Sequence, residues 1–181
     1  MTPLYNYLII SALGANRPNI LSELSGACLQ CGCNLLNSKV TVLGQELSLT
    51  LFVAGNWGAI AKMEALLPSL EQRLVLNLHT RRTQVPIFNS PMMIYIIQII
   101  AIDKSGILNG LSDFLLKQGI PIEELSGHTY STSTDTRMVS LSLKINVPDT
   151  VHLATLREQF MMYCDDNNLD GFMEPWRSDL T

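Results

Sequence analysis

An internal repeat constrains the fold of this 181-residue chain more than any other feature of its sequence. Residues 13–21 (LGANRPNIL) align with residues 100–108 (IAIDKSGIL) at an offset of 87. A later block, residues 47–51, aligns with residues 139–143 at an offset of 92, because the second copy carries five extra residues. The shared order of apolar, small and turn residues indicates one structural unit present twice. We therefore expect two small domains rather than one.

The first copy has the pattern strand, helix, strand, strand, helix, strand. Apolar periodicity and turn residues predict its strands at residues 5–13, 35–43, 46–53 and 74–83. Pro18 suits the first position of the first helix, because its missing N–H would be unpaired there, and Gly32 suits the C-terminal end of that helix. Asn56 is the expected N-cap of the second helix, which Pro68 must end or kink.

The second copy repeats this order. Its predicted strands are residues 93–102, 120–130, 137–147 and 171–177. Ser105 is the expected N-cap of its first helix, and Gly119 is expected to stop that helix. Asp149 is the expected N-cap of its second helix, which extends to about Asn167.

Together the two copies predict an α+β fold class with two tandem ferredoxin-like βαββαβ modules, each an antiparallel sheet with its helices on one face. The first module is residues 1–83, an extended linker with two prolines is residues 84–91, and the second module is residues 92–181. Residues 93–100 are apolar on both faces of their strand, whereas a strand with one wet face alternates. We therefore expect the other copy or another subunit to cover the second face, and expect a homo-oligomer.

Charge argues against direct nucleic-acid binding. The net charge is −4. Residues 1–90 carry six basic and four acidic side chains, whereas residues 91–181 carry six basic and twelve acidic ones. Arg81-Arg82 is the one adjacent basic pair, and a surface that tracks phosphates needs a denser basic stripe. The longest apolar run, residues 92–102, is interrupted by Gln98 and is too short to span a bilayer.

The cysteines and histidines do not form a recognisable catalytic or metal-binding set. Cys28, Cys31 and Cys33 lie too close together for a disulfide framework, and with Cys164 they are expected to be reduced packing thiols. Residues 166–171 fit half of an EF-hand loop, but Arg177 stands where a bidentate glutamate is required. We expect a cytoplasmic protein that is not an enzyme, needs no cofactor and does not bind a membrane.

The βαββαβ unit with a Gly/Pro-bearing turn before its first helix resembles the ACT domain. That family binds small effectors, often amino acids, and its typical turn is D-x-P-G-I. Residues 16–20 (NRPNI) keep the proline but have asparagine in place of the acidic residue and of the glycine. Residues 103–107 (DKSGI) keep the aspartate and the glycine but have serine in place of the proline.

A more specific resemblance covers nearly the whole chain and is strongest in residues 5–83. Five short motifs in order are similar to the glycine cleavage system transcriptional repressor family, which has two tandem ACT modules. They are residues 12–18 (ALGANRP), 31–34 (CGCN), 43–44 (LG), 55–60 (GNWGAI) and 64–68 (EALLP). The resemblance implies a negative regulator of the glycine cleavage operon that contacts a LysR-type activator, with glycine relieving that contact.

A helix N-terminus presents unpaired N–H groups and partial positive charge, which favours the carboxylate of an amino acid. Gly106 would allow close approach of a ligand, Asn19 could offer its amide, and Asn34 is expected to face the same crevice. The candidate effector-binding residues are therefore Gly14, Ala15, Asn16, Arg17, Pro18, Asn19, Ile20 and Asn34, with Asp103, Lys104, Ser105, Gly106 and Ile107. A purely structural helix start is the competing interpretation for both turns, and it is favoured for the second.

Three functional hypotheses remain open. The first is a non-enzymatic regulator that binds an amino acid and a protein partner. The second is a direct DNA-binding repressor, which a steep salt dependence of promoter binding without a partner would support. The third is the regulatory subunit of an amino-acid enzyme, which co-purification with an enzyme would favour.

Overall fold

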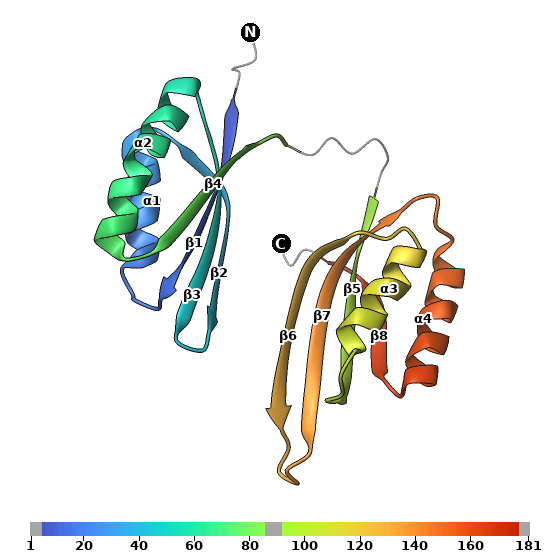
Figure 1. The fold of residues 1–181 in the computed structure, drawn as a ribbon. Coiled ribbons are helices and arrows are strands. Elements are labelled where there is room, and N and C mark those ends of the chain that lie inside the picture. Colours follow the sequence, from blue (N-terminus) through green and yellow to red (C-terminus); the bar gives the residue numbers. More distant parts are fainter. Residues whose placement is uncertain (1–4, 86–91, 178–181) are drawn as a thin grey trace. The chain divides into compact units, whose positions relative to one another are not determined.

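The computed structural model of the chain describes residues 5–85 and 92–177. They form two compact units, which divide the chain between residues 87 and 88 (Figure 1). Each unit has its own four-stranded sheet and its own hydrophobic core.

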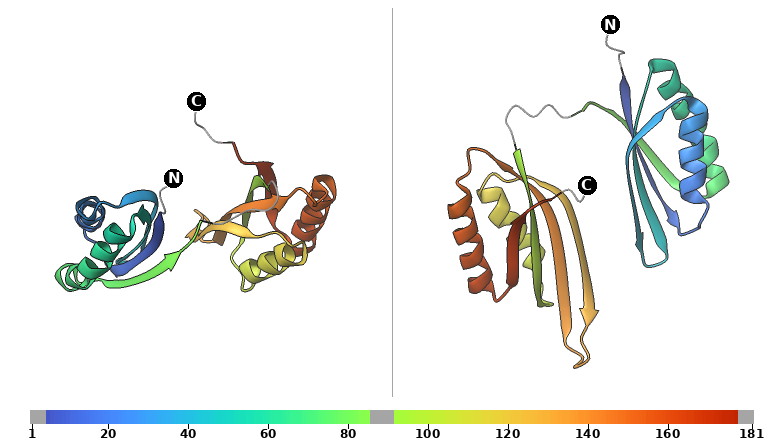
Figure 2. Two further views of the ribbon diagram at one scale, coloured as in Figure 1. Left: turned by 90° about the horizontal axis from the view of Figure 1, so that it is seen from above. Right: turned by 180° about the vertical axis from the view of Figure 1, so that it is seen from behind.

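The first unit contains two helices and four strands in the predicted order. They are β1 (Asn6–Ala15), α1 (Ile20–Cys31), β2 (Asn34–Leu43), β3 (Glu46–Gly55), α2 (Trp57–Leu74) and β4 (Asn77–Thr83). The strands lie in the order β2-β3-β1-β4, and every neighbouring pair is antiparallel. Both helices cover one face of this sheet (Figure 2).

The second unit repeats the first. Its elements are β5 (Met92–Ile102), α3 (Ile107–Lys117), β6 (Ile122–Ser131), β7 (Arg137–Pro148), α4 (Leu153–Asn167) and β8 (Asp170–Pro175). The strand order β6-β7-β5-β8 is equivalent to that of the first unit, and all pairs are again antiparallel. The predicted fold class, two ferredoxin-like βαββαβ modules, is confirmed.

Alternation along the strands builds each core. In β7 every second residue from Val139 to Val147 is buried, while the residues between them are half-buried. The buried side chains face the helices, where Phe160 of α4 is 1% exposed. In the first unit Leu51 of β3 and Met63 of α2 are fully buried in the equivalent layer. The two cores share no residue.

The α2 helix is longer than predicted. It continues through Pro68 to Leu74, and β4 begins only at Asn77, so Pro68 does not end the helix. The other predicted outcome, a kink at Pro68, stays a prediction. Leu67, Leu70 and Leu74 are all buried against the sheet. Packing of this apolar face outweighs the backbone hydrogen bond that a proline removes from a helix interior.

Three helix starts also differ from their predictions. Pro18 lies in the turn before α1, which begins at Ile20. The N-cap of α3 is Gly106 rather than Ser105. The N-cap of α4 is His152 rather than Asp149.

Other local predictions are confirmed. Gly32 and Gly119 follow α1 and α3 in the left-handed conformation, at φ 76° and 67°, where glycine avoids the steric cost of a β-carbon. Gly44, at φ 64°, forms the turn between β2 and β3. Asn56 caps α2, because its Oδ1 accepts a hydrogen bond from the Ala59 N–H at 2.8 Å.

The two faces of β5 differ in burial. Tyr95, Ile97, Ile99 and Ala101 are buried in the second core, whereas Ile102 on the opposite face is 63% exposed. What covers that second face stays a prediction. Residues 86–91 of the predicted linker lie outside the described residues. Within the described part of the chain, no helix has the length and apolar character needed to cross a membrane.

Candidate functional site

Two equivalent β–α turns form the candidate site. Residues 16–19 connect β1 to α1, and residues 103–106 connect β5 to α3. The Asn16 N–H donates a hydrogen bond to the Gln45 carbonyl, and the Asp103 N–H donates one to the Arg137 carbonyl, both at 2.9 Å. Both bonds tie the turn to the end of the neighbouring hairpin. The duplication therefore preserves the anchoring of the turn as well as its position.

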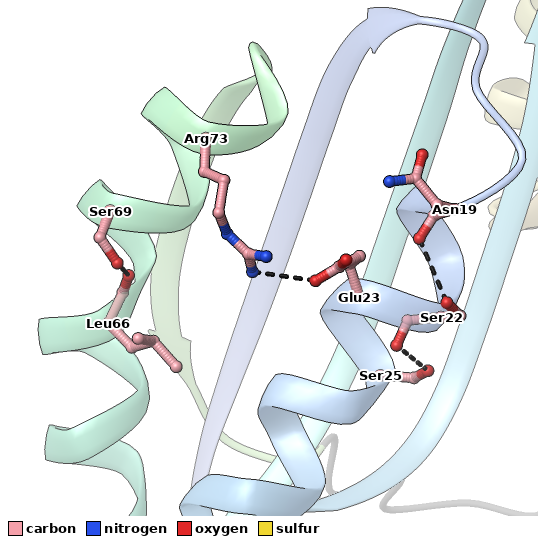
Figure 3. A network of polar contacts seen from close by, with 7 residues as sticks. All are labelled: Asn19, Ser22, Glu23, Ser25, Leu66, Ser69 and Arg73. Atoms are coloured by element: carbon pink, nitrogen blue, oxygen red, sulfur yellow. Dashed lines mark hydrogen bonds and ion pairs between the residues drawn. The ribbon is translucent and has the colours of Figure 1, made fainter.

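The first turn is closed by local backbone bonds. The Ile20 N–H donates to the Arg17 carbonyl at 3.3 Å, which places Pro18 at the second position of a β-turn, where its fixed φ is favourable. The Asn19 carbonyl accepts from the Glu23 N–H at 3.0 Å and from the Ser22 hydroxyl at 3.4 Å (Figure 3). The Asn19 side chain does not cap α1. Its amide therefore remains available to a ligand.

Arg17 is the charged residue of the first turn. Its side chain is half-buried, and its Nε is a buried donor that no described residue accepts from. Buried donors in folded proteins are nearly always paired, and a guanidinium pairs best with a carboxylate. The first turn thus combines a helix N-terminus with a cation whose donor is unsatisfied among residues 5–85 and 92–177.

The second turn uses its charged residues in structural contacts. Asp103 Oδ2 lies 3.4 Å from Arg137 Nε. Lys104 Nζ donates to the Asn167 carbonyl at 2.7 Å, at the C-terminal end of α4. A cation is favourable there, because the last carbonyls of a helix carry partial negative charge. Gly106 adopts φ 92°, and a β-carbon at this position would meet no atom within 4 Å, so its conformation rather than close packing requires glycine.

The remaining predicted site residues divide into three groups. Ile20 and Ile107 are buried in their cores, so they fix the helix starts. A β-carbon on Gly14 would lie 2.7 Å from Leu76 Cδ2, so Gly14 allows the approach of the α2–β4 connection. Ala15 and Ser105 are exposed beside their turns.

Asn34 does not lie with the first turn. Asn34 pairs with Ala54 near the end of β3, whereas Ala15 pairs with Glu46 at its beginning. These two positions on β3 are separated by roughly 27 Å at the rise of an antiparallel strand. The expectation that Asn34 faces the same crevice as the turn is therefore wrong within one unit. Helix α1 runs back across the sheet and delivers Asn34 to its opposite end.

The cysteines are packing residues. Burial, together with Cys33 and Cys31 nearby, raises the pKa of the Cys28 thiol to about 11, and burial raises the pKa of Cys164 to about 11. Burial also raises the pKa of Cys33. Thiols with such pKa values are protonated near neutrality and are poor nucleophiles. Among residues 5–85 and 92–177, no cluster of three metal-binding side chains occurs.

The fold and its repeated turn define a protein of two tandem ferredoxin-like βαββαβ modules. Residues 6–81, which span the described elements of the first unit, match the family model of the ACT domain. The first unit is therefore similar to the ACT domain, and the second unit repeats its topology.

The whole chain is similar to known regulators. It is 27% identical over 172 residues to the glycine cleavage system transcriptional repressor of Escherichia coli (strain K12), covering 92% of this chain and 88% of that protein. The repressor of Shigella flexneri matches with the same identity and coverage. The resemblance drawn from the sequence is confirmed, and it supports a regulatory ACT protein.

Two solved structures share the complete two-unit fold. One is described as a candidate glycine cleavage system transcriptional repressor. It has a TM-score of 0.73 and 24% identity, and the match covers 97% of this chain and 99% of that one. The other is a protein of unknown function from Galdieria sulphuraria with a TM-score of 0.76 and 17% identity, covering 96% and 99%. At these identities both matches establish the fold alone.

Proposed function

We propose that this protein is a non-enzymatic, amino-acid-sensing negative regulator of transcription of the glycine cleavage system that acts through a protein partner in the cytoplasm. The observation that carries the proposal is the similarity to the Escherichia coli repressor over 92% of this chain. The family resemblance implies glycine as the effector and a LysR-type activator as the partner. The net charge of −4 makes direct contact with DNA the less favourable route.

The first turn is the proposed effector site. Its support is the Arg17 Nε, which has no acceptor among the described residues and lies beside the N-terminus of α1, and the Asn19 side chain, which makes no capping hydrogen bond to α1. Arg17 would hold the carboxylate of the amino acid, and Asn19 would accept from its ammonium group through the amide oxygen. Lys104 of the second turn is already bound to the Asn167 carbonyl, so the second turn is the weaker site.

A thermal-shift panel of amino acids tests the sensing function. A ligand that binds only the folded state stabilises it by RT ln(1 + [L]/Kd), about 2.7 kcal/mol at a hundredfold excess over Kd. We expect glycine or a small relative to raise the melting temperature. The absence of any response up to millimolar amino acid would contradict an effector role.

Variants in the turn locate the site. We expect Arg17→Gln and Asn19→Trp to reduce the glycine-dependent shift, because the first removes the cation and the second fills the turn. Arg81→Gln is the matched control, since Arg81 is an exposed arginine of β4 on the sheet rather than at the turn. An undiminished shift in Arg17→Gln would move the site away from this turn.

The partner is tested separately. We expect the full chain to co-purify with a LysR-type activator in the absence of glycine and to release it when glycine is added. Salt-sensitive binding to the promoter without any protein would favour direct repression instead. Co-purification with an enzyme of amino-acid metabolism would favour a regulatory subunit.

A further inference from the structure

A groove between α1 and α2 of the first unit is separate from the turn described above. It is lined by Ser22, Glu23 and Gly26 of α1 and by Leu66, Leu70 and Arg73 of α2, and it encloses about 190 Å³. Figure 3 shows the two helices with Glu23 and Arg73 reaching toward each other across it. We call this feature the interhelical groove.

Gly26 keeps the interhelical groove open. It lies in the interior of α1, where glycine is among the least favourable residues. A β-carbon at Gly26 would meet no heavy atom within 4 Å, and Gly26 does not have a positive φ. Neither close packing nor backbone conformation therefore requires glycine here. The absence of a side chain at Gly26 leaves open space above the α1 backbone.

The rim of the groove carries one positive and one negative charge. Arg73 Nη2 lies 2.9 Å from Glu23 Oε2, with the side chains 58% and 33% exposed. Exposed ion pairs of this kind contribute little to stability, so Arg73 and Glu23 can separate at small cost. A guest with an ammonium and a carboxylate group would replace this single contact with two charge-assisted ones.

The floor of the groove limits the size of such a guest. Leu70 is buried and Leu66 is half-buried, so the floor is apolar where it meets α2. A cavity of this volume admits a molecule of a few heavy atoms rather than a peptide segment. A short aliphatic side chain, or none, would lie over Gly26 and Leu66.

We propose that the interhelical groove is a second binding site for a small zwitterionic α-amino acid. Glu23 accepts from its ammonium group, Arg73 holds its carboxylate, and the space above Gly26 takes its side chain. Ser22 connects this groove to the first turn, because its hydroxyl donates to the Asn19 carbonyl. The groove therefore lies on the same helix start as the proposed effector turn, although the two sites use different residues.

The test is a titration of the isotope-labelled full chain with glycine and alanine, followed by the backbone amide resonances. We expect both amino acids to shift the amides of Ser22 and Gly26. We expect methylamine and acetate, which each carry one of the two charges, to leave these amides unchanged at the concentration where glycine saturates.

Two variants and one matched control complete the test. Gly26→Leu fills the groove with a better helix former, so the fold should persist by circular dichroism while the groove shifts disappear. Glu23→Gln should weaken binding at least about tenfold, since the ammonium loses its charged acceptor. Glu64→Gln is the control, because it breaks a comparable ion pair with Arg82 outside the groove and should leave the affinity unchanged.

The outcomes separate this site from the proposed turn. Shifts confined to residues 16–19 that survive Gly26→Leu would overturn the groove and leave the turn proposal standing. Shifts at Ser22 and Gly26 that survive Arg17→Gln but not Gly26→Leu would support the groove. The absence of shifts at residues 16–19 would count against the turn. Unchanged amides at Ser22 and Gly26 up to millimolar amino acid would also overturn the inference.

Discussion

The first and second turns start from the same backbone arrangement and differ in how their charged residues are used. Both turns donate an N–H to the neighbouring hairpin at 2.9 Å. In the second turn Asp103 faces Arg137 and Lys104 binds the end of α4. In the first turn Arg17 has a buried Nε with no acceptor among the described residues. The charged residues of the second turn thus make contacts within the fold, whereas the Arg17 Nε of the first turn has no acceptor among the described residues.

This difference shows which part of a duplicated unit is constrained. The fold depends on buried alternate residues and on helices over one face, and both copies retain these. The polar groups of the turn contribute little to that core, so they can diverge without loss of the fold. The same comparison makes the two units testable against each other.

The largest expected effect is the loss of a core side chain from one unit. Phe160→Ala removes a ring that is 1% exposed and lies 6.2 Å from the Phe114 ring, and such truncations cost about 3–5 kcal/mol. Because the two cores share no residue, hydrogen exchange should accelerate in β5 and β7 and stay unchanged in β1 and β3. Met63→Ala should produce the reverse pattern. Equal acceleration in both units after either change would contradict independent cores.

The next largest effect is a difference in stability loss between substitutions in the two turns, which follows from their different backbone φ angles. Gly106 has φ 92° whereas Asn19 has φ −86°. Gly106→Ala should cost about 1–2 kcal/mol, since a β-carbon is strained in the left-handed region. Asn19→Ala should change stability by less than about 0.5 kcal/mol, because it loses no cap and meets no strain. Chemical denaturation of each full-length variant measures both values, and a loss at Asn19 equal to that at Gly106 would remove the distinction.

The helix caps show how much of this could be predicted from the sequence. Gly32 and Asn56 were correctly assigned because a left-handed glycine and a side-chain N-cap depend only on neighbouring residues. Ser105 and Asp149 are not the caps: α3 begins after Gly106 in the left-handed conformation, and α4 begins after His152, whose side chain accepts from the Thr155 N–H. Pro68 does not end α2, because burial of Leu67, Leu70 and Leu74 stabilises the helix beyond a local helix breaker.

The sequence predicted where the two candidate turns lie, but not which residues their charged side chains contact. The repeat placed both turns correctly at the start of a helix. The partner of Lys104 is 63 residues away in the sequence, and Glu23 and Arg73 lie on different helices. Asn34 was predicted to lie near the turn, but α1 runs back across the sheet, so β2 begins at the end of the sheet opposite the turn. Contacts of this range follow from the tertiary arrangement alone.

A smaller effect compares the N-caps of α2 and α4. Asn56 Oδ1 accepts from the Ala59 N–H at 2.8 Å, whereas His152 Nδ1 is 3.4 Å from the Thr155 nitrogen. Asn56→Ala should therefore cost about 1 kcal/mol, and His152→Ala should cost less. His152→Asn should recover a better cap and raise the melting temperature slightly. A larger loss at His152 than at Asn56 would mean that its bond to the Thr155 hydroxyl, at 3.0 Å, is the more important contact.

The smallest effect is an acid sensitivity of the first unit. Arg82 donates to both carboxylate oxygens of Glu64, at 2.9 and 2.7 Å, and ties β4 to α2. This contact lowers the pKa of Glu64 below its usual 4.5. A carboxyl group whose pKa is lower in the folded state stabilises that state above its unfolded pKa, and the contribution disappears as pH falls through the folded value. Stability should therefore fall as the pH drops below about 4.5, and Glu64→Gln should flatten that part of the profile while leaving exchange in the second unit unchanged. Because the side chains of Arg82 and Glu64 are partly exposed, added salt should weaken the stability that this ion pair contributes at neutral pH. If Glu64→Gln leaves the pH dependence of stability unchanged, other carboxylates cause the acid sensitivity.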